Sequence, residues 1–401
     1  MNLKIDNYCY MKNILLINCY FGKFPWYFNL FLKSCSYNAS VDFIIFSDDI
    51  TEYNLPKNVE IVPFTLRNFN ALATEKLKFE VNVEKAYKLC DFKPAYGIIF
   101  SEFVNEYEFW GMTDIDIIFG RIREFITEEL LNNYEVISVR NDYPTGSFML
   151  FKNNNEINNL FKKSKDYKKV LTSDIHYCFD ECNFKHEFLQ YGGDIFDIEC
   201  EVESMHYVIK KEEQMNNLKA HFDFLVIEGM PGQLKWDKGF LSFKHEFEIL
   251  LHHLILFKGN KYTRKKAWKR VPDKFYIDKF LVRKANLSSF NGLFKNTIYN
   301  KIVPNLKKSL FKIDFFLSRQ FKLKIMDLRK QALIQSKVKV VYNSEFETHN
   351  SIGQNKQPKI FKSILFKDSF FTPFIPNLRY KLKDNNQFDA IHINGNVRLI
   401  K

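Results

Sequence analysis

The stretch FWGMTDIDIIFG, Phe109–Gly120, decides the expected fold, because two aspartates one residue apart interrupt an apolar run. Successive side chains of an extended segment point to opposite faces, so Asp114 and Asp116 are expected to share one face. The isoleucines that follow them would then anchor the opposite face. Paired carboxylates suit Mg²⁺ or Mn²⁺, which prefer oxygen ligands and keep positions for phosphate oxygens. The stretch therefore predicts a metal–diphosphate site at the end of a central strand; a D-x-D that arose by chance is the alternative.

The composition indicates a folded chain with a sizeable core. The sequence has 401 residues, of which 46% are hydrophobic, enough for one large domain with an appendage or for two domains. Its seven cysteines are odd in number and include no C-x-x-C, which favours reduced thiols over a disulfide framework or a zinc knuckle. The first residues lack the pattern of a signal peptide, and no run reaches the roughly 18 apolar residues that span a bilayer. We therefore expect a cytoplasmic protein.

The charge is distributed unevenly along the chain. Residues 1–257 carry roughly −11 and residues 258–401 roughly +23, which together give the net charge of +12. Such a basic tail is suited to nucleic acid, anionic lipid headgroups or a phosphorylated substrate. Residues 302–336 mix Lys and Arg with apolar residues at helical spacing, which favours a surface helix on anionic lipid over nucleic acid. This predicts peripheral contact with the inner face of the cytoplasmic membrane.

Strand-like and helix-like segments alternate over the first 65 residues. Continuous apolar runs at 13–19, 42–46 and 59–64 predict buried strands, and 26–34 predicts a helix. This alternation is typical of an open, mostly parallel α/β sheet. Ligands of such sheets bind at the carboxyl ends of the strands, so the loops at 20–23 and 47–49 are expected beside the two aspartates.

Further helices and strands are expected after residue 65. Residues 66–107 are mostly helical with a break at Pro94, and helices are expected at 122–132, 156–164 and 201–219. Further strands are expected at 134–139, 146–151, 224–227, 234–236, 241–243 and 248–257.

Three spaced motifs carry a resemblance to a known family. They are YKxxDFKPxxG at 87–97, FWGxxDIDxxxG at 109–120 and GxFMLF at 146–151. In this order they resemble a bacterial family of GT-A-type glycosyltransferases from surface-polysaccharide gene clusters, over residues from about Lys12 to about Lys258. The resemblance implies a GT-A domain at 1–260, Rossmann-like with a mostly parallel sheet. A basic, partly helical C-terminal extension, 261–401, is not covered by it.

The resemblance also implies substrates and a cofactor. It implies a nucleotide-diphospho-sugar donor, for which we expect a UDP-sugar, and a glycan or lipid-linked acceptor. It further implies Mn²⁺ or Mg²⁺ held by Asp114 and Asp116 against the donor diphosphate. Some GT-A enzymes that retain the configuration of the sugar add a late histidine on a strand, followed by a lysine. The segment HHLILFKG resembles that ending, which implies His253, or His252 in its place, as a third ligand and Lys258 as a diphosphate contact.

Four further residues are candidate donor contacts. Lys93 precedes Pro94 and is expected to reach a donor phosphate or sugar hydroxyl; a solvated lysine at a helix end is the alternative. Asp48 ends a strand where GT-A proteins often hold the nucleoside. Tyr20 and Gly22 follow the first strand, although Gly22 is equally typical of a turn.

A polar segment near residue 180 holds the candidate catalytic carboxylates. Asp180 and Glu181 are candidates for a general base or for orienting the acceptor, and a solvated acidic loop is the alternative. An inverting enzyme needs such a base, whereas a retaining one does not. Two cysteines and two histidines around the pair resemble a loose metal cluster, but their spacing fits no zinc rule: Cys178, Cys182, His176 and His186.

Two other functions compete with a glycosyltransferase. A nucleotidyltransferase that makes an activated sugar usually has a Gly-rich, Lys/Arg-containing loop after the first strand, and here that loop has only Gly22 and Lys23. A non-catalytic nucleic-acid-binding protein would depend on the tail, bind with a steep salt dependence and not need Asp114. We expect no nucleic-acid partner.

Overall fold

The structure is a computed structural model that describes residues 13–223, 226–229, 232–243, 247–284 and 398–399. It forms two compact units, Met1–Val226 and Ile227–Lys401, each of which is described by itself. The units divide ahead of the boundary predicted at 260/261. The predicted helix at 302–336 lies outside the described residues, as does most of the basic tail.

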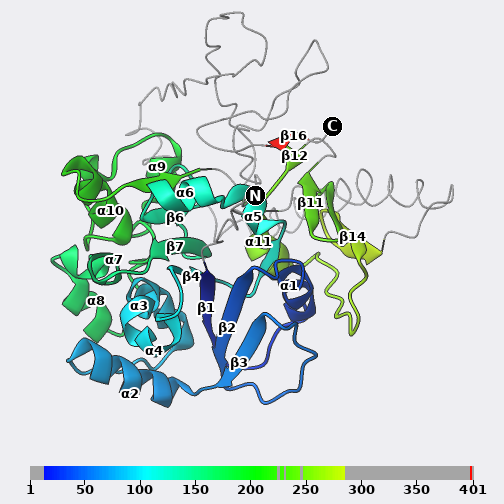
Figure 1. Cartoon of the computed structure of the whole chain (residues 1–401), viewed down its shortest axis with the longest axis horizontal. Coiled ribbons are helices and arrows are strands. Elements are labelled where there is room, and N and C mark those ends of the chain that lie inside the picture. Colours follow the sequence, from blue (N-terminus) through cyan, green and yellow to red (C-terminus); the bar gives the residue numbers. More distant parts are fainter. Residues whose placement is uncertain (1–12, 224–225, 230–231, 244–246, 285–397, 400–401) are drawn as a thin grey trace, which may run out of the picture. The chain divides into compact units, whose positions relative to one another are not determined.

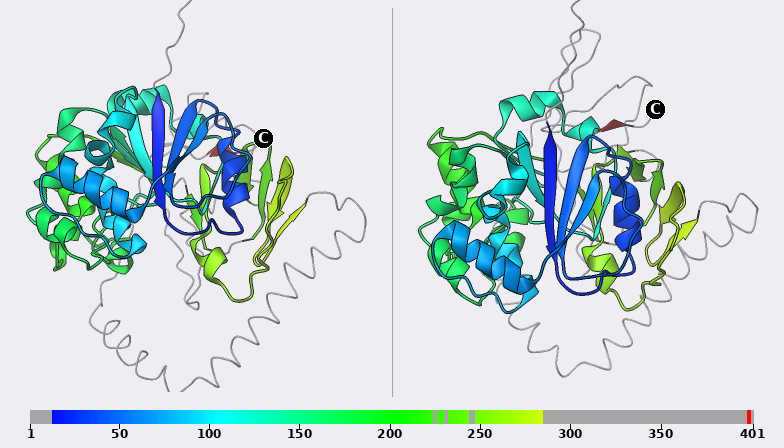
Figure 2. Two further views of the ribbon diagram at one scale, coloured as in Figure 1. Left: turned by 90° about the horizontal axis from the view of Figure 1, so that it is seen from below. Right: turned by 60° about the horizontal axis from the view of Figure 1, so that its bottom comes forward.

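The first unit is built on a seven-stranded sheet with the order β3-β2-β1-β4-β7-β6-β8 (Figure 1). Its strands are β1 Ile14–Tyr20, β2 Val41–Ser47, β3 Val59–Pro63, β4 Phe109–Thr113, β6 Val136–Ser138, β7 Phe148–Lys152 and β8 Ala220–Phe222. β1 runs parallel to β2 and β4, β2 to β3, and β6 to β8, whereas β7 is antiparallel to both its neighbours. Figure 2 shows β1, β2 and β3 side by side in two further views. The predicted α/β class with a mostly parallel sheet is confirmed.

Short helices connect and cover these strands. They are α1 Phe28–Cys35, α2 Leu66–Leu77, η1 Ala86–Ala95, α3 Tyr96–Ile99, α4 Ser101–Val104, α5 Ile122–Phe125, α6 Glu128–Asn133, α7 Asn155–Asn158, η2 Leu160–Lys163, α8 Tyr167–Thr172, α9 His186–Gln190, η3 Ile195–Asp197 and α10 Met205–Gln214. The predicted helix at 122–132 is wrong in detail, because Thr127 starts a second helix by accepting a hydrogen bond from the Leu130 amide. The predicted break at Pro94 is also wrong: Pro94 lies inside the 3₁₀ helix η1, and α3 follows directly.

The core of this unit explains one of the sequence motifs. Trp110 of β4 is fully buried, stacks on Phe151 with ring centroids 4.6 Å apart, and donates a 2.7 Å hydrogen bond to Asn158. A Cβ atom on Gly97 would lie 2.5 Å from the Trp110 ring. A glycine is therefore needed where α3 approaches the tryptophan.

The second unit contains an antiparallel sheet with the order β15-β14-β10-β11-β12-β16. The elements of this part are β9 Val226–Glu228, β10 Leu234–Asp237, β11 Phe240–Phe243, β12 Phe247–Glu248, β13 Leu251–His253, α11 Ile255–Gly259, β14 Lys274–Ile277, β15 Val282–Lys284 and β16 Arg398–Leu399. The continuous strand predicted at 248–257 is wrong, because the chain bends after each short strand and ends in α11. Among the described residues, no helix is long and apolar enough to cross a membrane.

Candidate active site at the end of strand β4

The carboxyl edge of the sheet in the first unit gathers the polar candidates. Tyr20, at the end of β1, pairs in register with Ser47 at the end of β2. β4 ends at Thr113, which lies opposite Phe148, the first residue of the antiparallel strand β7. The loops that follow β1, β2 and β4 and the loop that precedes β7 therefore meet at one edge, where α/β sheets bind ligands.

Asp114 and Asp116 lie in the turn that follows β4. The prediction that an extended strand places them on one face is wrong, because β4 ends at Thr113 and the chain turns before β5, Ile117–Phe119. Their carboxylate oxygens nevertheless lie within 4.8 Å of each other. Asp116 is 2% exposed, whereas the side chain of Asp114 is 33% exposed. One carboxylate is therefore fixed in the protein and the other is open to a ligand.

The chemistry of this pair fits a hard divalent cation. Burial, together with the negative charges of Asp116 and Asp114, raises the pKa of the Tyr27 hydroxyl far above its ordinary value. The two aspartates contribute to this shift through their negative charge, which a bound cation would offset. Carboxylate oxygens are the ligands that Mg²⁺ and Mn²⁺ prefer.

Lys93 places a positive charge against the same pair. Its ammonium donates 2.7 Å hydrogen bonds to Asp114 Oδ1 and to the carbonyl of Gly146, and the residue is 7% exposed. Burial alone would lower the pKa of Lys93, but the negative charge of Asp114 leads the effects that hold it well above its ordinary value. Lys93 is thus a permanent cation at the sheet edge, and the alternative of a solvated lysine is wrong.

Asp91, two residues earlier on η1, has a structural role. It is fully buried and accepts hydrogen bonds from Lys88 Nζ and from the backbone amides of Tyr177 and Phe179. Burial acts to raise its pKa, but the partners of Asp91, His176 first among them, hold that pKa below its ordinary value. Asp91 therefore fixes the loop that leads into Asp180 and Glu181.

Asp180 and Glu181 are drawn into the protein by this loop, so the alternative of a solvated acidic loop is wrong. Asp180 is 3% exposed, and burial raises its pKa well above the ordinary value although the Lys93 ammonium opposes the shift. Burial also acts to raise the pKa of Glu181, but its hydrogen bond with His186 leads the effects that lower it. The two neighbours are thus biased toward opposite protonation states. Their catalytic roles stay predictions.

Gly146 joins the acidic loop to Lys93. Its amide donates a 2.8 Å hydrogen bond to Glu181 Oε1, and its carbonyl accepts from Lys93. A Cβ atom at this position would lie 1.9 Å from Asp180 Oδ2, so the acidic loop can approach only because residue 146 is glycine.

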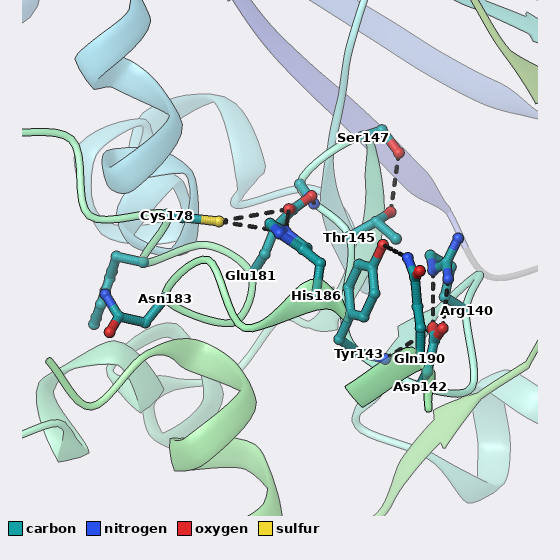
Figure 3. A network of polar contacts seen from close by, with 12 residues as sticks. Arg140, Asp142, Tyr143, Thr145, Ser147, Cys178, Glu181, Asn183, His186 and Gln190 are labelled. Carbon is teal, nitrogen blue, oxygen red and sulfur yellow. Dashed lines mark hydrogen bonds and ion pairs between the residues drawn. The ribbon is translucent and has the colours of Figure 1, made fainter. Parts of the chain in front are cut away.

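Glu181 Oε2 points to two further side chains, as Figure 3 shows. It lies 2.7 Å from His186 Nε2 and 3.6 Å from Cys178 Sγ, and the last two atoms are also 3.6 Å apart. Hydrogen bonds to Cys178 and Glu181 raise the pKa of His186 to about 10, although burial alone would lower it. The imidazole therefore carries a proton at neutral pH.

Carboxylates of the loop after β2 accept hydrogen bonds from backbone amides of the loop after β1. Asp48 Oδ1 accepts a 2.6 Å hydrogen bond from the Gly22 amide, and Asp49 Oδ2 accepts one of 2.8 Å from the Phe24 amide. Gly22 has φ of +95°, so it is also the turn residue that the sequence suggested. The Tyr20 hydroxyl donates to the Lys23 carbonyl at 3.4 Å. The predicted donor contacts of Tyr20, Gly22 and Asp48 stay predictions.

The predicted late histidine and lysine lie in the second unit. His252 and His253 are adjacent on β13; Nδ1 of His252 lies 2.7 Å from the Ile227 carbonyl, and Nδ1 of His253 lies 2.8 Å from Glu228 Oε1. Lys258 lies on the helix α11. The assignment of His253 as a third metal ligand and of Lys258 as a diphosphate contact joins residues of separate units and stays a prediction.

Three residues that organise this site are not among the site residues predicted from the sequence: Asp91, Gly146 and His186. Asp91 and Gly146 were visible as fixed positions of the motifs at 87–97 and 146–151, so the motifs were the signal that could have found them. His186 was grouped with Cys178, Cys182 and His176 as a loose metal cluster, and the sequence does not reveal that the loop folds back to bring it to Glu181.

Comparisons with known proteins add a family and a distant structural likeness. A family model described as a family of unknown function (DUF6625) matches residues 16–286. The search of curated proteins gave no match. Among solved structures, the chain is similar to mouse xyloside xylosyltransferase 1 in its apo form, with 10% identity and a TM-score of 0.28, over 52% of this chain and 84% of that chain. A likeness of this size carries no functional argument.

Proposed function

The chain belongs to the DUF6625 family, a family of unknown function, so we propose a function from its side chains and sequence motifs. The protein is proposed to be a metal-dependent glycosyltransferase that uses a nucleotide-diphospho-sugar. The motifs at 87–97, 109–120 and 146–151 support this proposal through their resemblance to GT-A-type enzymes.

One structural observation carries the proposal. Two carboxylates, Asp114 and Asp116, lie within 4.8 Å of each other beyond β4, and the buried ammonium of Lys93 is 2.7 Å from the first of them. A diphosphate needs cationic partners, and a metal ion needs carboxylates. This sheet edge offers both kinds of group within a few ångströms.

Each residue has a proposed task during glycosyl transfer. Asp114 and Asp116 would hold Mn²⁺ or Mg²⁺, which when bound offsets the charge of the leaving nucleoside diphosphate. Lys93 keeps its proton because Asp114 is beside it, so it supplies a fixed positive charge for a phosphate oxygen. Glu181 and Gly146 hold Lys93 in place through the Gly146 peptide. Asp180 remains the proposed group that faces the acceptor.

The finer assignments follow the resemblance. A UDP-sugar is the proposed donor, and a glycan or a lipid-linked glycan precursor is the proposed acceptor. Tyr20, Gly22 and Asp48 are the proposed nucleoside contacts, and Lys258 and His253 are the proposed late contacts to diphosphate and metal. Peripheral binding to anionic lipid through the basic C-terminal region is proposed from its charge alone.

Thermal unfolding with candidate ligands tests the proposal. The full-length protein is melted with UDP-sugars or GDP-sugars, each with and without Mn²⁺, and nucleotide release is then measured with the donors that stabilise it. A rise in melting temperature that needs both the metal and the sugar nucleotide supports a glycosyltransferase. Stabilisation by a nucleoside triphosphate but by no sugar nucleotide would instead identify a nucleotidyltransferase.

Matched variants locate the effect. Asp116→Asn should abolish the metal-dependent stabilisation, because it removes one of the two carboxylates. Asp42→Asn is the control, since Asp42 lies near the start of β2 and accepts its 2.9 Å hydrogen bond from Tyr107, away from the carboxyl edge. Equal metal-dependent stabilisation in both variants would contradict the proposal.

A further inference from the structure

A second group of possible metal ligands lies on the loop that precedes α9 and at the start of that helix. Cys178 Sγ, Glu181 Oε2 and His186 Nε2 all lie within 4.8 Å of one another. Figure 3 shows the three side chains converging from the loop and the helix start. The thiol is buried, while Glu181 and His186 are 23% and 33% exposed, so an ion can reach them from one side.

The distances within the group match those around a tetrahedral zinc ion. Zinc lies about 2.3 Å from sulfur and about 2.0–2.2 Å from nitrogen and oxygen, which places sulfur about 3.6 Å from the other ligand atoms. Both separations from Cys178 Sγ are 3.6 Å. The separation of 2.7 Å between Glu181 and His186 is that of a hydrogen bond, and it would widen to about 3.4 Å once the ion replaces the shared proton.

We propose that Cys178, Glu181 and His186 form a zinc site with three protein ligands and a fourth position open to water or another small ligand. The proposal is independent of the proposed glycosyltransferase activity. A thiolate, an imidazole and one carboxylate suit Zn²⁺, whereas the carboxylates of Asp114 and Asp116 suit harder ions. The chain would then bind two different metals at two chemically distinct places.

The backbone around the group supports a built site. Cys178, Asn183 and Phe184 all have positive φ, at 52°, 49° and 60°, a conformation that costs free energy for residues other than glycine. This loop conformation brings Cys178 and His186 to the carboxylate of Glu181. Hydrogen bonds to the backbone of the loop help to hold this course: the Asn183 side chain donates to the Tyr177 carbonyl at 3.0 Å.

Zinc binding would release two protons and fix the loop. The thiol of Cys178 and the imidazolium of His186 must each lose a proton to become ligands. Glu181 Oε1 would keep its hydrogen bond from the Gly146 amide while Oε2 turns to the ion. The occupied site would therefore pin the acidic loop to the peptide that holds Lys93.

Cobalt substitution tests the site without an activity assay. Full-length protein is stripped of metal with a chelator, returned to buffer at pH 8 and titrated with Co²⁺. One equivalent should produce a thiolate-to-cobalt charge-transfer band in the near ultraviolet, and Zn²⁺ should remove it. Absence of the band in the wild-type protein would overturn the proposal, whatever the variants do.

Matched variants assign the ligands. Cys178→Ser should lose the band, and His186→Gln and Glu181→Gln should each weaken Co²⁺ binding by at least about tenfold. Cys35→Ser is the control, because it removes a buried thiol on α1 that is not one of the three ligands. The double variant Asp114→Asn, Asp116→Asn should retain the band. A band that persists in Cys178→Ser, or that disappears in the double aspartate variant, would overturn the assignment.

Discussion

The two lysine–aspartate pairs that begin on η1 differ in what surrounds them. Lys88 and Asp91 are 2.8 Å apart with side chains that are 2% and 0% exposed; Lys93 and Asp114 are 2.7 Å apart with side chains that are 8% and 33% exposed. The first pair is enclosed by hydrogen-bond partners. Asp91 also accepts hydrogen bonds from two backbone amides, and Lys88 also donates hydrogen bonds to the carbonyls of Val170 and Ile175. In the second pair, the Asp114 carboxylate is partly exposed to solvent.

This difference separates architecture from chemistry. A buried ion pair whose every hydrogen-bonding group is engaged has no capacity for a ligand, and its removal affects folding. A pair with one partly exposed carboxylate can exchange a contact for a metal ion or a phosphate. The two lysine–aspartate pairs have the same charges and nearly the same distance, yet one has a structural role and the other can bind a ligand.

Breaking the enclosed pair should have the largest effect on stability. Asp91→Asn leaves the Lys88 ammonium buried without its counter-charge, which should lower the free energy of unfolding by roughly 3–5 kcal/mol. Urea unfolding followed by tryptophan fluorescence measures this. Asp42→Asn, which loses a partly exposed contact, serves as the control at about 1 kcal/mol or less. A loss equally small in both variants would remove the distinction between the pairs.

Breaking the open pair should instead affect activity. Lys93→Met removes the fixed positive charge, so the rate of nucleotide release in the presence of donor and Mn²⁺ should fall by at least about 100-fold. The free energy of unfolding of Lys93→Met should fall by less than that of Asp91→Asn, because Asp114 can be solvated and the main loss is the buried hydrogen bond to the Gly146 carbonyl. A large loss of stability with unchanged turnover would show that this pair, too, is architectural.

Moving the open pair without removing it should have a smaller effect. In Gly146→Ala the new methyl group would meet Asp180 Oδ2 at 1.9 Å, so the peptide whose carbonyl receives Lys93 must shift. We expect a roughly tenfold lower rate of nucleotide release and a destabilisation of about 1–3 kcal/mol. Rates and urea midpoints of Gly146→Ala and Gly193→Ala can be compared, since the three atoms nearest to a Cβ on Gly193 all belong to the Phe188 ring, outside the proposed site. Equal loss of activity in both would argue against a role specific to residue 146.

The buried base His206 should have the smallest effect at neutral pH, because its contribution to stability changes only as the pH falls below the pKa of the free imidazole. Burial, with help from the positive charge of Lys210, lowers the pKa of His206 to about 3. Its unfolded form binds a proton below about pH 6.5, so stability is lost as the pH falls from there toward 3, by at most about 1.4 kcal/mol per pH unit. His206→Met should flatten the dependence of unfolding free energy on pH between 6.5 and 4. An unchanged slope would contradict this prediction.

The parallel sheet could be predicted from the sequence because its signal is local. Continuous apolar runs marked β1, β2 and β3 within about two residues of their observed ends. The turn at Asp114 was not visible, because Ile115 in the turn and Ile117 at the start of β5 are both buried, just as they would be in one continuous strand. The spacing of apolar residues indicates which residues are buried. It cannot distinguish a continuous strand from a strand followed by a turn when both bury the same isoleucines.

The site was only partly accessible from the sequence for a related reason. The two metal-type aspartates stand close together in the chain, whereas Asp91 acts on amides 86 and 88 residues away, and Lys93 reaches a carbonyl 53 residues away. Such contacts leave no local pattern. For this reason the sequence could not exclude the two alternatives of a solvated Lys93 and of a solvated acidic loop at Asp180. Lys93 is buried by its contacts with Asp114 and Gly146, and Asp180 lies on the loop that Asp91 holds.

The 3₁₀ form of η1 makes the edge of the sheet sensitive to the length of one short segment. With three residues per turn, each added residue rotates the rest of the helix by about 120°. One extra residue between Asp91 and Lys93 would remove no side chain of the site, but it would turn the Lys93 ammonium away from Asp114. The number of residues in this segment, and not only their identity, is therefore part of what the protein must preserve.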